Sequence, residues 1–285
     1  MRLTVLGSGS PEPHVRRASS GYLLEVGHDC ILFDCGGGVF DNLIRSGRKP
    51  SDITHLFFTH LHSDHMMDYA RLVHAAWDEG AAPLKVFGPA PIAQITNAYF
   101  GPDGLFAHDL RARTELMPSQ AVWKARGGTL PRAWPAPVVT EITGGDSVSG
   151  ETWSLTSCTV PHAQPALDCM AFALVHAGRK FVYSGDAGLC DPLEALCADA
   201  DFLIHWCYRL DGEVADPEMM GLTPTPSEIA QMAQVAGVRQ LLLTHFRVQM
   251  DTAQGHAAAL ASMAAVFDGK NGVLEDLQVY EINRA

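Results

Sequence analysis

Four side chains that can bind a metal ion lie close together, in the segment Thr59-His60-Leu61-His62-Ser63-Asp64-His65. The preceding run, 53–58, is apolar, β-branched and aromatic, which predicts a buried strand. Side chains two apart at a strand end point the same way, so His60 and His62 can converge on one ion. Asp64 and His65 follow where a helix is expected to begin, and they therefore face a second point nearby. A lone histidine is usually a packed or solvated residue, but this spacing favours two metal ions side by side.

Later apolar runs end in further residues of the same kind. His162, Asp186 and His245 each follow a predicted strand, and His205 ends another one. Strand ends in open α/β sheets share the edge at which such sheets hold their sites. We therefore expect these side chains to join the 60–65 segment at one edge.

Asp34 ends the apolar run 30–33, just before a glycine-rich turn and a predicted short helix at 39–45. It could orient a metal-bound histidine by accepting the second N–H of that ring. It could equally cap the helix. The sequence leaves both roles open.

Composition limits the class of protein. The chain has 285 residues, 47% of them hydrophobic and 18% charged, which fits one large α/β domain or two small ones. We expect neither a signal peptide nor a membrane span. The seven cysteines are odd in number and scattered, which favours reduced thiols and a cytoplasmic protein. The net charge of −12 argues against a nucleic-acid surface, because phosphate binding needs clustered Lys and Arg.

Strand and helix patterns alternate along the chain, with antiparallel hairpins in each half. This predicts two sheets packed together between outer helices. The stretch of about 100–137 differs, because it holds two tryptophans and several Pro and Gly without a clean period. We interpret it as a cap, or lid, over the site.

The chain resembles the metallo-β-lactamase-fold hydrolases, and its sequence is most similar to their ribonuclease Z and arylsulfatase-like branch. The likeness runs from Arg2 to about Phe246 and rests on the motifs His60-x-His62-x-Asp64-His65, His162, Ser-Gly-Asp186 and Leu-Thr-His245-Phe. It implies a single domain over 1–285 with a four-layer αββα sandwich, and two divalent ions per chain, usually zinc. Residue by residue it implies the first ion on His60, His62 and His162, the second on Asp64, His65 and His245, and Asp186 bridging both.

Departures from the family pattern narrow the choice. True β-lactamases of this fold usually have Cys where Asp186 stands. Ribonuclease Z uses a His-Glu pair and a further His beside the metals. Here His205 is kept, but Trp206 replaces the Glu and Thr223 stands in place of the second His. The long basic arm that grips transfer RNA is not evident either, so the resemblance does not by itself favour transfer-RNA maturation.

Seven ligands without Cys suit zinc, and manganese or iron are also accepted by such sites. A metal-bridging hydroxide would attack the substrate, because the ions lower the pKa of bound water toward ~7. We assign Asp64 to orient that hydroxide and accept its proton. His205 is interpreted either as a donor to the leaving group or as a supporting core residue.

The expected function is hydrolysis of a small ester, amide, lactone, sulfate ester or phosphodiester. Trp206 and Tyr208 predict an apolar or aromatic small-molecule substrate, and Arg17, Arg16 or His14 could pair with an anionic group of it. Nucleic acid and membrane are not expected as partners, and a homodimer is left open. The alternatives are a ribonuclease Z-type nuclease that processes tRNA 3′ ends, and a non-catalytic metal-binding regulatory protein.

Overall fold

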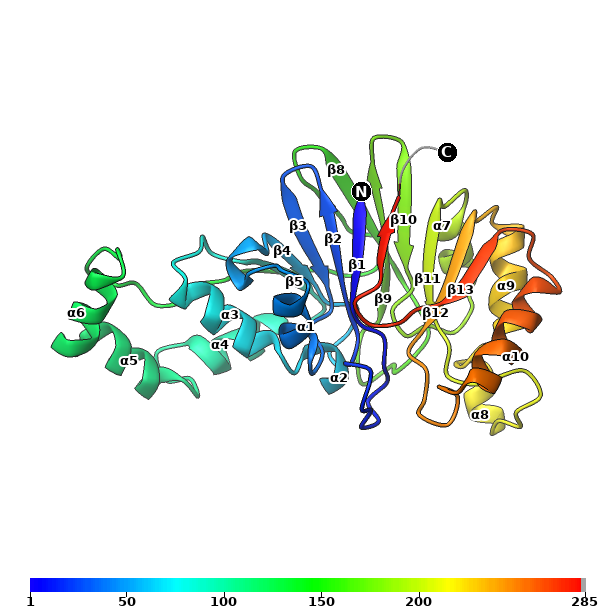
Figure 1. The fold of residues 1–285 in the computed structure, drawn as a ribbon, viewed down its shortest axis with the longest axis horizontal. Coiled ribbons are helices and arrows are strands. Elements are labelled where there is room, and N and C mark those ends of the chain that lie inside the picture. Colours follow the sequence, from blue (N-terminus) through cyan, green and yellow to red (C-terminus); the bar gives the residue numbers. More distant parts are fainter. Residues whose placement is uncertain (283–285) are drawn as a thin grey trace.

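The computed structural model describes residues 1–282, which form two seven-stranded sheets (Figure 1). The first sheet has the order β14 (Val279–Glu281), β1 (Arg2–Gly7), β2 (Gly21–Val26), β3 (Asp29–Phe33), β4 (His55–Phe57), β5 (Lys85–Gly88) and β6 (Val138–Glu141). The second has the order β13 (Lys270–Val273), β12 (Gln240–Thr244), β11 (Phe202–Trp206), β10 (Arg179–Tyr183), β9 (Met170–His176), β8 (Trp153–Thr159) and β7 (Ser147–Ser149).

Each sheet is antiparallel on one side and parallel on the other. The run β3-β4-β5-β6 is parallel in the first sheet, and β10-β11-β12-β13 is parallel in the second. Because parallel strands end at the same edge, the loops after β3, β4, β10, β11 and β12 can meet there. In Figure 1 this edge lies toward the bottom, near α2, and the β2–β3 hairpin lies at the opposite end.

Helices cover the outer face of each sheet. Beside the first sheet lie α1 (Val39–Arg45), η1 (Pro50–Asp52), α2 (Ser63–Met66), α3 (Tyr69–Asp78) and α4 (Ile92–Phe100). The next two helices, α5 (Ala107–Glu115) and α6 (Met117–Ala125), extend beyond them (Figure 1). Beside the second lie α7 (Asp191–Cys197), α8 (Pro217–Met220), α9 (Pro226–Val235) and α10 (Ala253–Ala264). Among residues 1–282, none of these helices combines the length and the apolar character needed to cross a bilayer.

Three buried clusters hold the four layers together. Alternate residues of a strand face opposite sides, so Phe33 faces the other sheet while Leu32 faces the helices. Between the sheets, the Phe33 ring lies 6.0 Å from Phe172 and 5.6 Å from Phe181, centroid to centroid. Helix–sheet clusters complete the αββα sandwich on both outer faces. The fold class predicted from the sequence is thereby confirmed.

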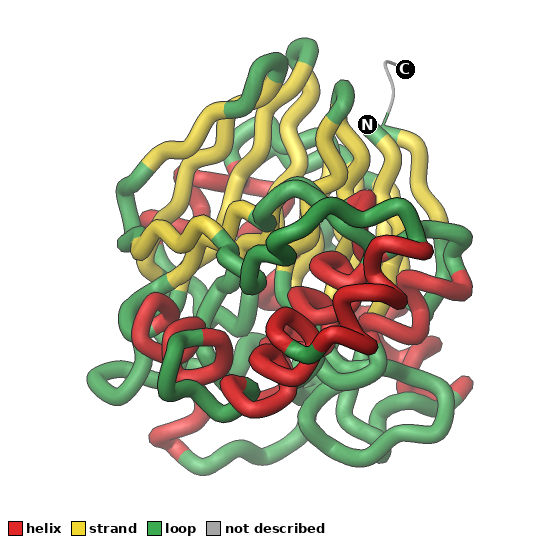
Figure 2. Tube along the Cα trace, turned by 90° about the vertical axis from the view of Figure 1, so that its left-hand side faces the viewer, coloured by secondary structure: helices red, strands yellow, loops and turns green. Residues whose placement is uncertain are grey.

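The segment 100–137 contains two helices, α5 and α6, which its irregular pattern did not predict. They project from the flank of the body (Figure 1), and Figure 2 looks at the molecule from that flank. The Arg132 guanidinium stacks between the rings of Trp77 and Trp123, at 3.6 and 4.1 Å, and beside them is a cavity of about 340 Å³. The segment packs against the end of α3, and its role as a cap over the site stays a prediction.

Candidate metal centre

The loop between β4 and α3 carries the histidine-rich segment. His60 is fully buried, His62 precedes the first residue of α2, and Asp64 and His65 lie within that single turn of helix. The change from extended to helical backbone after His62 separates the four side chains into two groups, as the sequence indicated.

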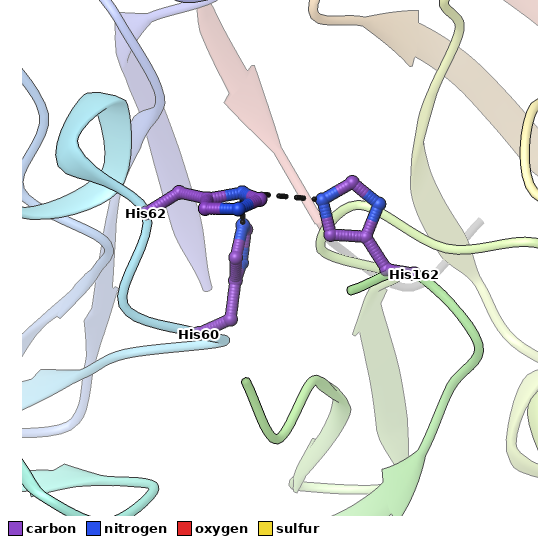
Figure 3. A group of neighbouring side chains, drawn as sticks. All are labelled: His60, His62 and His162. Carbon is purple, nitrogen blue, oxygen red and sulfur yellow. Dashed lines mark hydrogen bonds between the residues drawn. The ribbon is translucent and has the colours of Figure 1, made fainter. Parts of the chain in front are cut away.

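Three imidazole rings meet at the first group (Figure 3). The Nδ1 atom of His62 lies 3.0 Å from Nε2 of His60 and 3.3 Å from Nε2 of His162. Burial lowers the pKa of His60 and of His162, so both rings are neutral and offer lone pairs at neutral pH. Ring nitrogens of a tetrahedral zinc site stand about 3.3 Å apart, which follows from Zn–N bonds of about 2.0–2.1 Å. The three rings therefore fit one ion.

A second group lies beside the first. His245 Nε2 is 3.2 Å from Asp64 Oδ2, and His65 Nε2 is 3.5 Å from the same oxygen. One ligand atom from each of Asp64, His65 and His245 falls within 4.8 Å of the other two. This geometry is also suitable for a single ion.

Asp186 lies between the two groups. Its Oδ2 is 3.2 Å from His245 Nε2 and 3.7 Å from His162 Nε2, and its Oδ1 is 3.5 Å from His65 Nε2. Burial alone would raise the pKa of Asp186, but the neighbouring histidines hold that pKa well below its usual range. A carboxylate in this position can contact ligands of both groups.

Gly185 allows this close approach. It has a φ of 57°, and a Cβ atom there would lie 2.8 Å from the Cβ of Thr59. A larger residue would therefore push the Asp186 loop away from the loop that carries His60 and His62.

Orphaned atoms test whether these residues fit a metal. Within residues 1–282, His65 Nε2 and Asp186 Oδ1 are buried without any hydrogen-bond partner. Buried polar atoms are normally paired, and unpaired ones call for an unseen ion or water. Because both atoms face the shared space between the groups, the donor set fits divalent ions.

Asp34 fixes the second group from behind. Its Oδ2 lies 2.7 Å from Nδ1 of His65 and 2.8 Å from the hydroxyl of Tyr183, and its Oδ1 accepts from the backbone N–H of Thr59 at 2.8 Å. Helix α1 is capped instead by Asp68, whose Oδ2 accepts from the N–H groups at 38 and 40. Of the two roles left open by the sequence, the geometry supports orientation of His65.

His205 is fully buried at the end of β11, and its Nδ1 lies 2.8 Å from the carbonyl oxygen of Trp206. A carbonyl only accepts, so Nδ1 carries the proton and Nε2 presents a lone pair. Burial lowers the pKa of His205 to about 4, which leaves the ring neutral at neutral pH. In this form Nε2 accepts a proton, so the predicted donation to a leaving group would first require protonation.

The predicted substrate contacts divide into two kinds. The Trp206 ring lies 5.1 Å from His162 and 5.6 Å from His245, and Tyr208 stands 6.3 Å from His245. Both aromatic residues therefore border the centre, but Trp206 is buried and only Tyr208 is partly exposed.

Arg17 differs. Its side chain is 2% exposed, and its guanidinium bonds to Ser8 Oγ at 2.6 Å and to Asp251 Oδ1 at 2.7 Å. His14 and Arg16 also contact Asp251. Because its terminal nitrogens are already held by the protein, the burial of Arg17 argues against a role in binding substrate.

The sequence interpretation missed several supporting residues. Tyr183, Thr59 and Asp68 gave no signal as isolated polar residues, and Asp251 lies far along the chain from the arginines it binds. Tyr183 stands three positions before Asp186, and that proximity was the one usable clue.

Comparisons with known proteins agree with the geometry. Residues 30–246 match the family profile described as the β-lactamase superfamily domain. The chain is 29% identical over 292 aligned positions to ribonuclease Z from Mycobacterium sp. (strain KMS), covering 99% of this chain and 96% of that protein.

Two solved structures share the fold over almost their whole length. The metallo-β-lactamase fold protein YhfI from Bacillus subtilis aligns with a TM-score of 0.76 and 20% identity, covering 98% of this chain and 99% of that one. The short form of human tRNase Z aligns with a TM-score of 0.70 and 22% identity, covering all of both chains. The matched relatives support the ribonuclease Z side of the expected resemblance and give no support to its arylsulfatase side.

Proposed function

The chain belongs to the metallo-β-lactamase superfamily, in its ribonuclease Z branch, and from this premise we propose that it is a metal-dependent phosphodiesterase that cleaves RNA. The observation that carries the proposal is that the chain has a His/Asp set able to hold metal ions and matches, over 99% of its length, relatives named ribonuclease Z.

The expectation of a small-molecule substrate, with nucleic acid not expected as a partner, was wrong, and the findings support the ribonuclease Z alternative better. The relatives that overturn it are named for ribonuclease Z, and a structural neighbour is a tRNase Z. That expectation rested on the departures at Trp206 and Thr223 and on the net charge of −12, which is an average over the whole chain. Such an average says little about the field at one buried centre.

We assign two divalent ions to the centre, with zinc first and manganese or iron as substitutes. His60, His62 and His162 would hold one ion, Asp64, His65 and His245 the other, and Asp186 would contact both. The distances of 3.0 and 3.3 Å between ring nitrogens and the orphaned His65 and Asp186 atoms support this assignment. When bound, the ions supply Lewis-acid polarisation of the phosphodiester and a water of lowered pKa.

The protein's own groups then do the positioning. Burial acts to raise the pKa of Asp64, but His245 and His65 beside it lower that pKa by more, so the net shift is downward. The carboxylate is therefore ionised and can accept a proton from an attacking water. Tyr208 is half-buried beside His245 and offers a ring on which a base or sugar can pack, while the buried Trp206 supports it from beside His162. His205 lies at the same sheet edge, but its ring is fully buried, which supports the second of its two predicted roles, a supporting core residue.

The test is RNA cleavage by the purified protein, with metal content measured by elemental analysis on the same sample. The substrates are a transfer-RNA precursor with a 3′ extension and an unstructured RNA of equal length. We expect cleavage by the wild type and its loss in His62→Ala. His176→Ala is the matched control, because His176 ends β9 at the far end of the sheet. Protein that carries two metal equivalents and cleaves neither RNA would refute the proposal.

A further inference from the structure

Two buried tyrosines cross the interface between the sheets just beneath the metal centre. Tyr22 belongs to β2 of the first sheet and Tyr183 to β10 of the second, and both are almost completely inaccessible to solvent. Their ring centroids lie 4.7 Å apart. Each hydroxyl reaches a residue of the opposite sheet or its loops, so the pair forms a reciprocal contact between the two halves of the molecule.

Tyr183 reaches the first half. Its hydroxyl donates to Oδ2 of Asp34 at 2.8 Å, and the same oxygen lies 2.7 Å from Nδ1 of His65. The Asp34 backbone has a φ of 56°, a left-handed conformation that a non-glycine residue keeps only when its surroundings hold it. Tyr183 is therefore one of the groups that fix Asp34, and through Asp34 it acts on His65.

Tyr22 reaches the second half. Its hydroxyl lies 2.6 Å from Oγ1 of Thr244, the residue directly before His245. His245 has a φ of 63°, again left-handed, and its N–H donates to the carbonyl of Ser8 at 2.9 Å. Tyr22 thus holds the strand end from which His245 projects.

Both contacts converge on one ligand group. His65 comes from the first half of the chain and His245 from the second, and together with Asp64 they form the second metal group. We propose that Tyr22 and Tyr183 are positioning residues that set the separation of His65 and His245, and so the affinity of the ion held there. The inference rests on the proposed two-ion centre.

A plain structural role is the competing explanation, since any buried hydroxyl needs a partner. Tyr69 provides the matched control. It is also fully buried, and its hydroxyl lies 2.9 Å from Oγ1 of Thr96, between α3 and α4. Tyr69→Phe therefore removes the same kind of bond from a place that contacts no predicted ligand.

The experiment measures metal affinity and apo-protein stability in Tyr22→Phe, Tyr183→Phe, the double variant and Tyr69→Phe. Stripped protein is titrated with Zn²⁺ in competition with a chromogenic chelator, and the two dissociation constants are fitted separately. We expect one constant to rise about tenfold in each single variant, the low end of effects seen when a group behind a metal ligand is removed. The other constant should stay within about twofold of wild type. Apo-protein melting temperatures should match that of Tyr69→Phe.

The double variant adds a second criterion. Because both tyrosines set one separation, their effects on affinity should be less than multiplicative. The proposal is overturned if the Tyr22 and Tyr183 variants bind both ions as the wild type does, or lose no more affinity than Tyr69→Phe. Wild-type protein that binds no Zn²⁺ would instead remove the two-ion centre itself, and this outcome is visible without any variant.

Discussion

Replacing Asp34 by Asn tests how the centre is held together. The carboxylate accepts from donors on both oxygens: Thr59 N–H at one, and His65 Nδ1 and the Tyr183 hydroxyl at the other. An asparagine amide presents one oxygen and one NH₂ group, so either way round it leaves a buried N–H without an acceptor. A buried donor without a partner costs about 1–3 kcal/mol.

The effect on metal binding is separate. Loss of the group that orients a metal-bound histidine typically weakens affinity about 10–100-fold, which is about 1.4–2.8 kcal/mol. We therefore expect Asp34→Asn to lower the free energy of unfolding of the apo protein by about 1–3 kcal/mol. The metal-loaded variant should lose more unfolding free energy than the apo variant does, because its metal affinity is also weaker. The assay is urea unfolding followed by tryptophan fluorescence, with and without Zn²⁺.

Asp68→Asn is the control, because it is the same substitution in a carboxylate that only caps α1. Asn is itself a good helix cap, so this variant should change stability little and metal affinity not at all. The reasoning is refuted if Asp34→Asn binds Zn²⁺ as tightly as wild type and unfolds at the same urea concentration.

Three further outcomes follow from the structure. Burial alone would raise the pKa of Asp251, but its bond to Arg17 holds that pKa well below the usual value. The stabilisation from this ion pair is fully present above the unfolded pKa of about 3.9 and is lost as the pH falls further, so wild-type stability should decrease below about pH 4. Asp251→Asn should lower the free energy of unfolding by about 3–5 kcal/mol at pH 7, measured by urea unfolding. His205→Asn keeps a donor near the Nδ1 position and His205→Gln keeps polar atoms near Nε2; if Nε2 contacts substrate, RNA cleavage should fall more in the Asn variant, and equal losses would contradict that role. Arg132→Ala removes stacking on Trp77 and should destabilise the 100–137 segment by about 1–2 kcal/mol, seen as faster limited proteolysis there with Zn²⁺ affinity unchanged.

The candidate centre was predictable because its signal is local. The spacing of His60, His62, Asp64 and His65 needs only a strand end and the start of a helix, and those two patterns are readable in a short window. The later predicted ligands could be recognised because each follows an apolar run. The αββα layers followed from alternation of strands and helices together with the family resemblance.

What the sequence could not supply depends on distant contacts. Arg17 is of a residue type that often binds anionic substrates, but its partner Asp251 lies near the other end of the chain. Only the folded structure shows that the charge of Arg17 is already paired. The same holds for Tyr183, whose importance depends on Asp34 in the opposite sheet. Helices α5 and α6 escaped prediction because their residues lack a sustained apolar period.

The net charge of the chain was a poor guide to nucleic-acid binding, because electrostatic effects depend on where the charges lie. Two divalent ions would bring four positive charges to the centre, while Asp64 and Asp186 return two negative ones. Salt at physiological strength screens exposed charges beyond about 8 Å. Exposed carboxylates elsewhere on the body therefore contribute little to the potential at the pocket, whereas the buried groups around the ions are screened much less. A protein of net charge −12 can in this way present a locally positive floor to a phosphodiester. Binding of RNA then depends on the charges that line its path to the centre, and a whole-chain total does not record them.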